Sequence, residues 1–290
     1  MKFIELSRFS ESEILDVHNE AFSDYEVPME ISLDSFKYLN LRRGVRYDLS
    51  LGAVDGENLV GFILNAIDNW EGKLTAYDCG TGVVPKYRQK GLGNQIFTHL
   101  LPLLKAENIE QYLLEVIQTN IAAYNLYKKR DFQITREFDC LLADVKEVKL
   151  KFQDKEKSDL TKGYNIRDIT NLTWNKVKKY WDYSPSWQNS ELSIQRVPNS
   201  FHYLGAFLKD KLVGYMVYEP SGGITQIAVD QNHRNQNIGT EFIKNLIEKV
   251  PEIEKLNIIN IDKRDTALLN LFSKIGFKSF TAQYEMILEI

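Results

Sequence analysis

Residues 83–101 read VVPKYRQKGLGNQIFTHLL, and this stretch decides the fold. A β-rich run, LTAYDCGTGVV, leads into it, and its second part has apolar residues at helical spacing. Two glycines, Gly91 and Gly93, lie where the strand would pass into the helix. The stretch therefore predicts a strand, a glycine-rich turn and a helix in direct succession.

Such a turn has a chemical use. A helix N-terminus leaves backbone N–H groups unpaired and carries about half a unit of positive charge, so it binds phosphate when nothing blocks the approach. Gly91 and Gly93 remove the side chains that would block it. A plain loop-to-helix turn is the alternative interpretation. In the phosphate hypothesis, a pyrophosphate accepts hydrogen bonds from the backbone amides of Gln89, Lys90, Gly91, Leu92, Gly93 and Asn94. The side chains of Arg88 and Lys90 are the cations nearby.

The turn recurs in changed form, as RNQNIG at 234–239, 146 residues after RQKGLG at 88–93. The segment LEVIQTNIAAYNLYKKRDF (114–132) also aligns without a gap on INIDKRDTALLNLFSKIGF (259–277), an offset of 145 residues. Two such matches indicate an internal repeat. We expect a first domain at 1–152, a polar linker at 153–163 and a second domain at 164–290.

Both halves show one order of elements. In the first we expect a strand, two helices, three strands, the turn with its helix, a buried strand, a short helix capped by Asn120, and closing strands near 132–139 and 145–152. In the second half Asp265 is the corresponding cap. An insert without counterpart, YWDYSPSWQNSELSIQR (180–196), is expected either to cover a cleft or to pack against the neighbouring domain.

Composition narrows the class of protein. Apolar residues make up 43% and charged residues 26% of the chain, as in ordinary folded proteins. Neither an apolar leader nor an apolar run of about 18 residues is present, so we expect a cytoplasmic protein without membrane contact. The only cysteines, Cys79 and Cys140, have no metal-ligand spacing with the four histidines, so no metal site is expected. A net charge of −4 with dispersed Lys and Arg argues against nucleic acid as a partner.

The pattern VxPxYRxxGxG, followed by a helix, a strand, an Asn, an LY pair and a terminal aromatic residue, resembles the GNAT superfamily of N-acetyltransferases. In this sequence the pattern comprises Val83–Gly93, Leu114–Val116, Asn120, Tyr127 and Phe132. The second half resembles the family more weakly, through 227–230, 234–239, Asp265, Leu271, Phe272, Gly276 and Phe277. The resemblance implies an α+β, three-layer fold with two tandem domains, each a mixed, splayed central sheet flanked by helices.

The resemblance also implies acetyl-CoA as cosubstrate. GNAT-like sheets splay between their fourth and fifth strands, and the pantetheine amides pair with the exposed edge, here Thr81, Gly82 and Val83. The N–H of Val83 would face the thioester oxygen and stabilise the charge that builds there. Gly80 and Gly82 also fit a β-bulge, which is compatible because a bulge leaves an edge unpaired. Asn120 would bond the cofactor as well as cap its helix.

Tyr127 is the candidate general acid. Acetyl transfer releases a thiolate, and a phenol with a reference pKa of about 10 can protonate it. Packing in the core is the alternative, but position 272, the counterpart of 127, is Phe, so a ring suffices for packing there. For the general base we name Asp78 and Glu115, and a structural hydrogen bond is an equally good interpretation of Glu115.

We therefore expect an N-acetyltransferase that moves the acetyl group to a primary amine by direct attack in a ternary complex, catalysed in the first half. Asn237 and Phe272 suggest that the second half kept its fold and lost its chemistry. A non-catalytic acyl-CoA sensor or scaffold is one alternative, and a second half that shapes a cleft or a homodimer is another. The acceptor is a small-molecule or peptide amine, and a cationic one would suit the eight acidic residues that Ser10–Phe36 contains without any Lys or Arg: Glu11, Glu13, Asp16, Glu20, Asp24, Glu26, Glu30 and Asp34.

Overall fold

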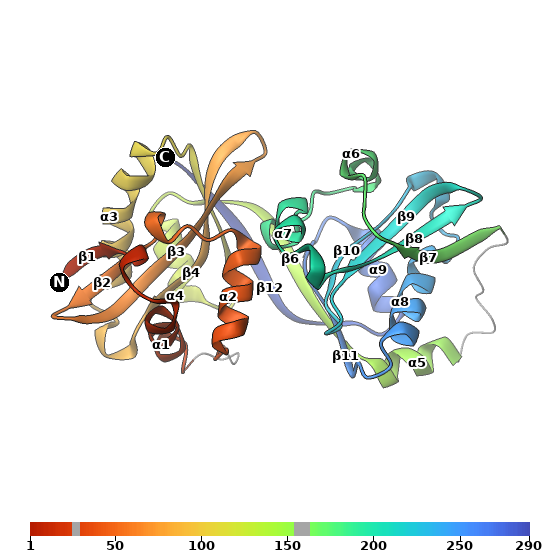
Figure 1. Ribbon diagram of the computed structural model, residues 1–290, viewed down its shortest axis with the longest axis horizontal. Coiled ribbons are helices and arrows are strands. Elements are labelled where there is room, and N and C mark those ends of the chain that lie inside the picture. Colours follow the sequence, from red (N-terminus) through yellow and green to blue (C-terminus); the bar gives the residue numbers. More distant parts are fainter. Residues whose placement is uncertain (25–29, 154–162) are drawn as a thin grey trace. The chain divides into compact units, whose positions relative to one another are not determined.

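The computed structural model describes residues 1–24, 30–153 and 163–290 (Figure 1). They form two compact units, each with a core of its own. The predicted linker lies outside the described residues except for its two end positions, 153 and 163. The first unit contains Met1–Val116, Asn120–Thr135 and Glu285–Ile290, and the second contains Ile117–Thr119 and Arg136–Tyr284.

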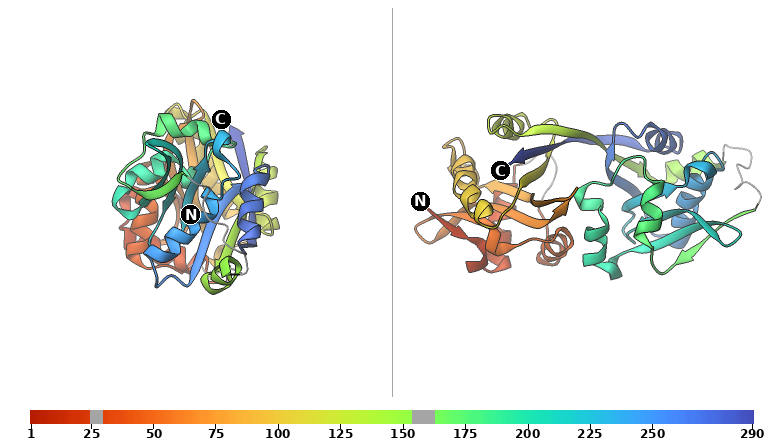
Figure 2. Two further views of the ribbon diagram at one scale, coloured as in Figure 1. Left: turned by 90° about the vertical axis from the view of Figure 1, so that its right-hand side faces the viewer. Right: turned by 90° about the horizontal axis from the view of Figure 1, so that it is seen from above.

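The first unit has a sheet with strand order β1-β2-β3-β4-β5-β12. Strands β1 to β4 are antiparallel neighbours, and β5 runs parallel to β4. Helix α1 packs on one face of the sheet and α3 on the other (Figure 2). The bounds are β1 Lys2–Glu5, α1 Glu11–Ala21, α2 Leu33–Arg43, β2 Leu51–Asp55, β3 Asn58–Trp70, β4 Lys73–Val83, α3 Leu92–Ala106, β5 Gln111–Ile117 and α4 Ile121–Lys128.

Strands β4 and β5 separate soon after they meet. They pair only through Thr75–Tyr77 against Gln111–Leu113. Just beyond, the register between β3 and β4 shifts so that Cys79 is an extra, bulged residue. The splay between the fourth and fifth strands and the bulge beside Gly80 are both confirmed. The bulge leaves the β5 side of β4 unpaired from Asp78 onward.

The second unit repeats this arrangement. Its sheet β10-β9-β8-β7 is antiparallel, and β10 meets β11 only through one isolated bridge, Gly223–Asn257. A register shift makes Thr225 the bulged residue of β10, where the first unit has Cys79. The bounds are β7 Tyr164–Ile169, α6 Trp174–Val177, α7 Glu191–Arg196, β8 His202–Leu208, β9 Lys211–Tyr218, β10 Ile224–Val229, α8 Ile238–Lys249, β11 Lys255–Asp262, α9 Thr266–Lys274 and β12 Lys278–Glu289.

Each unit contains a strand segment from the other half of the sequence. The end of β12 lies in the first unit, where the N–H of Ile290 donates to the carbonyl of Glu110 at 3.0 Å. Most of β6 (Gln133–Asp144) lies in the second unit, where it pairs antiparallel with β11. The compact units are therefore not contiguous stretches of chain.

The closing strand predicted at 145–152 is wrong, because Val145–Gln153 forms helix α5. Val145 and Val148 are buried three positions apart, and Lys146, Glu147 and Lys149 around them are exposed. A helix places residues three apart on one face, whereas a strand would turn them to opposite faces. The edge of β5 is covered by β12 instead.

Candidate functional site

The glycine-rich turn has the same backbone in both units. Gly91, with φ 71°, is the N-cap of α3, and Asn237, with φ 62°, is the N-cap of α8. In α3 the N–H of Gln95 donates to the carbonyl of Gly91 at 3.0 Å, so the amides before it have no acceptor within the helix. The turn therefore survives in the second half, as the sequence predicts. Asn237 can adopt this conformation because Asn tolerates left-handed backbone better than most residues.

Gly93 is not explained by the packing of the protein. Its φ is not positive, and a Cβ there would meet only Val83 Cγ2, at an ordinary 3.9 Å. A Cβ on Gly91 would meet nothing within 4 Å. Gly239, the counterpart of Gly93 in the second unit, differs from it, since a Cβ there would lie 2.5 Å from Leu271 Cδ2. In the first unit the space over the helix end is therefore open, which fits the predicted approach of a phosphate.

The side chain of Arg88 serves the fold in both copies. Its Nη1 and Nη2 donate to the Asp24 carboxylate at 2.7 and 2.8 Å, and Nη2 also donates to the carbonyl of Ala21 at 2.6 Å. These bonds hold the pKa of Asp24 below its ordinary value. Arg234 pairs in the same way with Asp182, at 2.6 Å. The guanidinium thus ties the turn to the end of α1, and only the backbone of Arg88 remains for the predicted ligand.

The start of α3 has a second cation that the sequence did not reveal. Arg130 donates from Nε to Asn94 Oδ1 at 2.6 Å and from Nη2 to the Asn94 carbonyl at 2.8 Å. It belongs to a run of basic residues that reads as an ordinary solvated helix end. The exposed Lys90 Nζ lies 3.2 Å from the carbonyl of Lys86. Lys90 and Arg130 are therefore the cations that the first unit offers beside the turn.

The edge of β4 supports the predicted role of Val83. The N–H of Val84 donates to the carbonyl of Val60 on β3 at 3.1 Å. Amide directions alternate along an antiparallel strand, so the N–H of Val83 faces away from β3, toward the splayed side. Gly82 has a packing reason of its own, because a Cβ there would lie 2.7 Å from the ring of Phe62.

Tyr127 and Asp78 meet at the splay. The Tyr127 hydroxyl donates to Asp78 Oδ2 at 3.3 Å, and the same carboxylate accepts from Thr81 Oγ1 at 2.7 Å and from the N–H of Gly80 at 2.8 Å. Burial raises the pKa of Asp78 in spite of these three hydrogen bonds. The Tyr127 ring packs against Phe132 with centroids 5.4 Å apart.

Glu115 and Asn120 follow on the other side of the splay. Glu115 is half-buried on β5, beyond its last pairing with β4, and its Oε2 accepts from the Tyr77 hydroxyl at 3.1 Å. Burial and the charge of Glu115 raise the pKa of Tyr77. Asn120 is confirmed as the cap of α4, since its side chain accepts from the N–H of Ala123 at 3.1 Å.

The second unit lacks all three candidate catalytic side chains. In the alignment of the repeats, the positions of Asp78, Glu115 and Tyr127 hold Ile224, Asn260 and Phe272. Phe272 is fully buried and packs against Phe277, so the ring alone serves the fold there.

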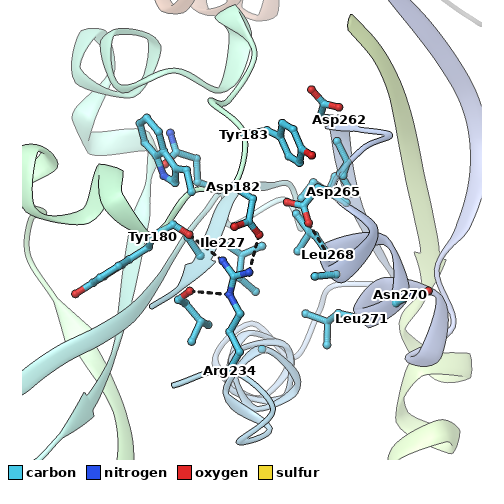
Figure 3. A pocket seen from close by; sticks show the side chains of 18 of the residues that line it. Tyr180, Asp182, Tyr183, Ile227, Arg234, Asp262, Asp265, Leu268, Asn270 and Leu271 are labelled. Atoms are coloured by element: carbon cyan, nitrogen blue, oxygen red, sulfur yellow. Dashed lines mark hydrogen bonds and ion pairs between the residues drawn. The ribbon is translucent and has the colours of Figure 1, made fainter. Parts of the chain in front are cut away.

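A cavity of about 640 Å³ nevertheless opens in the second unit, between β10 and β11 (Figure 3). Residues of the 180–196 insert line it, among them Tyr180 and Tyr183, so the expectation that the insert covers a cleft is confirmed.

Some carboxylates of the acidic segment Ser10–Phe36 make contacts within the first unit, and others are exposed. Glu13 forms a capping box with Ser10, and Asp24 pairs with Arg88. Glu26 lies outside the described residues, whereas Asp16, Glu20, Glu30 and Asp34 are exposed.

Among the residues that the structure describes, no group of three or more His, Cys, Asp or Glu side chains could hold a metal ion. In the same residues no helix is both long and apolar enough to cross a membrane.

Comparison with known proteins agrees with this geometry. The chain resembles a tandem GNAT protein from the clavulanic acid biosynthesis pathway, with TM-score 0.76, 14% identity and coverage of 99% of this chain and 98% of that one. A GCN5-related N-acetyltransferase from Sphaerobacter thermophilus gives TM-score 0.71, 14% identity and coverage of 99% and 95%. At these identities the likeness shows the fold alone. No curated protein matches the chain in sequence.

The sequence itself carries the family signature twice. The model described as "Acetyltransferase (GNAT) family" matches residues 12–132 and again residues 165–277. Together the two matches cover well over half of the chain. The chain therefore belongs to the acetyltransferase (GNAT) family, as a tandem arrangement of two copies of its fold.

Proposed function

We propose that the first half transfers an acetyl group from acetyl-CoA to a primary amine, by direct attack of the amine within a ternary complex. One observation carries the proposal: Tyr127 with its partner Asp78 and the open turn at Gly91–Gly93 occur together in this half. Their counterparts in the other half are Phe272, Ile224 and Asn237, none of which can take over these roles. That contrast supports an active first copy and a second copy without chemistry.

The turn is the proposed seat of the cosubstrate's pyrophosphate. The amides of Leu92, Gly93 and Asn94 would donate to it, since a helix end binds anions with its first N–H groups. Lys90 and Arg130 add positive charge beside them. The free edge of β4 would pair with the pantetheine amides, in the way that a peptide adds to a sheet edge.

The reaction balances with the groups in place. The amine nitrogen forms a bond to the thioester carbonyl carbon, and the N–H of Val83 stabilises the oxyanion. The C–S bond then breaks with its electron pair on sulfur, and the Tyr127 hydroxyl supplies the proton for the thiol. Asp78, which accepts the Tyr127 hydrogen bond at 3.3 Å, holds the phenol in position, and the phenolate regains its proton from solvent before the next turnover.

For the general base we favour Glu115 over Asp78. The Asp78 carboxylate accepts hydrogen bonds from Gly80, from Thr81 and from Tyr127, which is the proposed acid. Glu115 lies on β5, across the splay from Asp78, and its Oε2 accepts from the Tyr77 hydroxyl at 3.1 Å. If Glu115 removes the amine proton, Glu115→Gln loses the acidic limb of the pH profile of kcat/KM and Asp78→Asn keeps it.

The acceptor is proposed to be a cationic amine. The exposed carboxylates of Asp16, Glu20, Glu30 and Asp34 give the segment Ser10–Phe36 a negative field, because this segment contains no Lys or Arg. A screen of polyamines, aminoglycosides, amino acids and lysyl peptides tests this, with acetyl-CoA as donor. Thiol release with none of them would leave the proposal without support.

The deciding experiment measures amine-dependent thiol release by the full chain and by Tyr127→Phe. The full chain is needed because removal of 164–290 would also remove the segment Glu285–Ile290 from the first unit. Turnover that collapses in Tyr127→Phe supports the proposal. Tight acetyl-CoA binding without turnover of any amine would identify a sensor or scaffold instead.

A further inference from the structure

The cavity of the second unit has no part in the proposed reaction. It lies where the first unit would hold its cosubstrate, but its lining has changed (Figure 3). Its walls are apolar along Ile227, Leu268 and Leu271, and Tyr180 and Tyr183 of the insert stand over it. A cavity of about 640 Å³ that combines apolar walls with polar and charged side chains is large enough for a small molecule.

The end of the cavity at the turn is poor in phosphate-binding groups. In the alignment of the repeats, Lys90 and Arg130 are replaced by Gln236 and Ile275, and Gly91 by Asn237. The turn therefore has two fewer cations and one more side chain over its amides. Arg234 does not restore the charge, because it is engaged by Asp182.

Carboxylates gather at the N-terminal end of α9, where Figure 3 shows Asp182, Asp262 and Asp265 around the cavity. Asp182 pairs with Arg234 at 2.6 Å, and Asp262 pairs with Arg264 at 2.7 Å. Asp265 forms no ion pair with any residue that the structure describes. One of its oxygens caps α9 by accepting from the N–H of Leu268 at 3.0 Å.

The charge of Asp265 is not needed for that cap. Asn120 caps the corresponding helix of the first unit through the same bond, at 3.1 Å. Burial, followed by the charges of Asp182 and Asp262, raises the pKa of Asp265, while the Leu268 N–H and the charge of Arg234 act in the opposite direction. Lys274, the cation of the cavity lining on this helix, lies at the other end of α9, about 13 Å away at 1.5 Å per residue. A cationic ligand beside Asp265 would stabilise the charged form of its carboxyl group.

Thr225 offers a polar group to a ligand. This bulged residue lines the cavity and is only 5% exposed as a whole. Its hydroxyl makes no hydrogen bond to the described parts of the chain and is not sealed off from the cavity. A polar group of a ligand inside the cavity can therefore bond to it.

We propose that this cavity binds a small organic cation, an amine with an apolar or aromatic body, rather than a nucleotide. The ammonium group lies against Asp265, and the body lies on Ile227, Leu268 and Leu271. The second copy of the fold has in this way kept the cleft and reversed the charge of its ligand. The site does not depend on catalysis in the first half, so it is tested by binding and not by turnover.

The experiment is calorimetric titration of the full chain with tyramine and with tyrosol, its neutral hydroxyl analogue of similar shape. Tyramine is expected to bind at least about tenfold more tightly than tyrosol. Asp265→Asn, which keeps the cap as Asn120 does, should reduce tyramine affinity about tenfold and leave tyrosol unchanged. Glu248→Gln is the control, since Glu248 is exposed on α8 and outside the cavity lining.

Three results would overturn the proposal. Equal affinities for tyramine and tyrosol would show that the cavity does not distinguish a cationic ligand from a neutral one. An unchanged tyramine affinity in Asp265→Asn, or an equal loss in Glu248→Gln, would place the amine elsewhere. Binding of two CoA molecules per chain would make the cavity a nucleotide site.

Discussion

Replacement of Gly93 by Ala should move stability and cosubstrate binding in opposite directions. Gly93 is the second residue of α3 and its φ is not positive, so Ala fits the backbone. The added Cβ lies 3.9 Å from Val83 Cγ2, an ordinary contact without strain. Gly is less favourable than Ala in a helix interior by about 1 kcal/mol, so the variant should gain up to about that much. The melting temperature would rise by up to about 2–4 °C.

Acetyl-CoA binding should weaken at the same time. The methyl group projects into the open space over the first amides of α3, where the pyrophosphate is proposed to lie. A displaced phosphate loses at least one hydrogen bond to a charged group, each contributing about 1.5–3 kcal/mol. That corresponds to a Kd for acetyl-CoA that is roughly 10- to 100-fold higher.

Calorimetric titration with acetyl-CoA and a thermal melt of the same preparation measure both effects. Gly239→Ala is the matched control: its Cβ would lie 2.5 Å from Leu271 Cδ2, so it should lower the melting temperature and leave the Kd unchanged. A Gly93→Ala protein that is as stable as the parent, or more so, and has the parent's Kd would refute the phosphate role of the turn.

Three further predictions follow from the same geometry. Tyr127→Phe should lower kcat by roughly 10²- to 10⁴-fold in a thiol-release assay and leave the KM for acetyl-CoA and the melting temperature nearly unchanged; an unaltered kcat would exclude the hydroxyl as the acid. Gly91→Asn should fold normally, since Asn237 holds the same backbone at φ 62°, but bind acetyl-CoA at least about tenfold more weakly in titration. The pKa of Asp78 is raised above 3.8 in the folded protein, so the folded state binds the proton more tightly and the parent should lose stability relative to Asp78→Asn as the pH rises from below 3.8 through the raised value. Urea unfolding of both proteins across pH 3 to 8 measures this difference, and a difference independent of pH would contradict the shift.

The turn, the repeat, the bulge and the helix caps could all be predicted from the sequence. These features depend on neighbouring residues: Gly or Asn at a left-handed position, Asn or Asp three residues before the N–H that it caps, and glycines in a strand. Helix α5 was missed, although Val145 and Val148 already have helical spacing.

Contacts between distant residues were out of reach. The Tyr127–Asp78 bond joins positions 49 apart, and the Arg88–Asp24 pair joins positions 64 apart. The sequence shows all four of these residues, but it does not show which of the many possible partners each one contacts in the fold. From the sequence Arg88 is therefore expected to bind phosphate, whereas in the structure its guanidinium forms an ion pair with Asp24.

By itself the sequence determined that the chain repeats one fold and that Gly91 and Tyr127 occur in only one copy, because residue identity and spacing carry that information directly. Three features became visible only in the folded chain. Strands β6 and β12 are each divided between the two compact units, and the Tyr127 hydroxyl donates a hydrogen bond to Asp78. The second copy also encloses a cavity with Asp265 at one end. The physical reason is that strand partners, buried charges and cavities depend on which distant side chains come into contact.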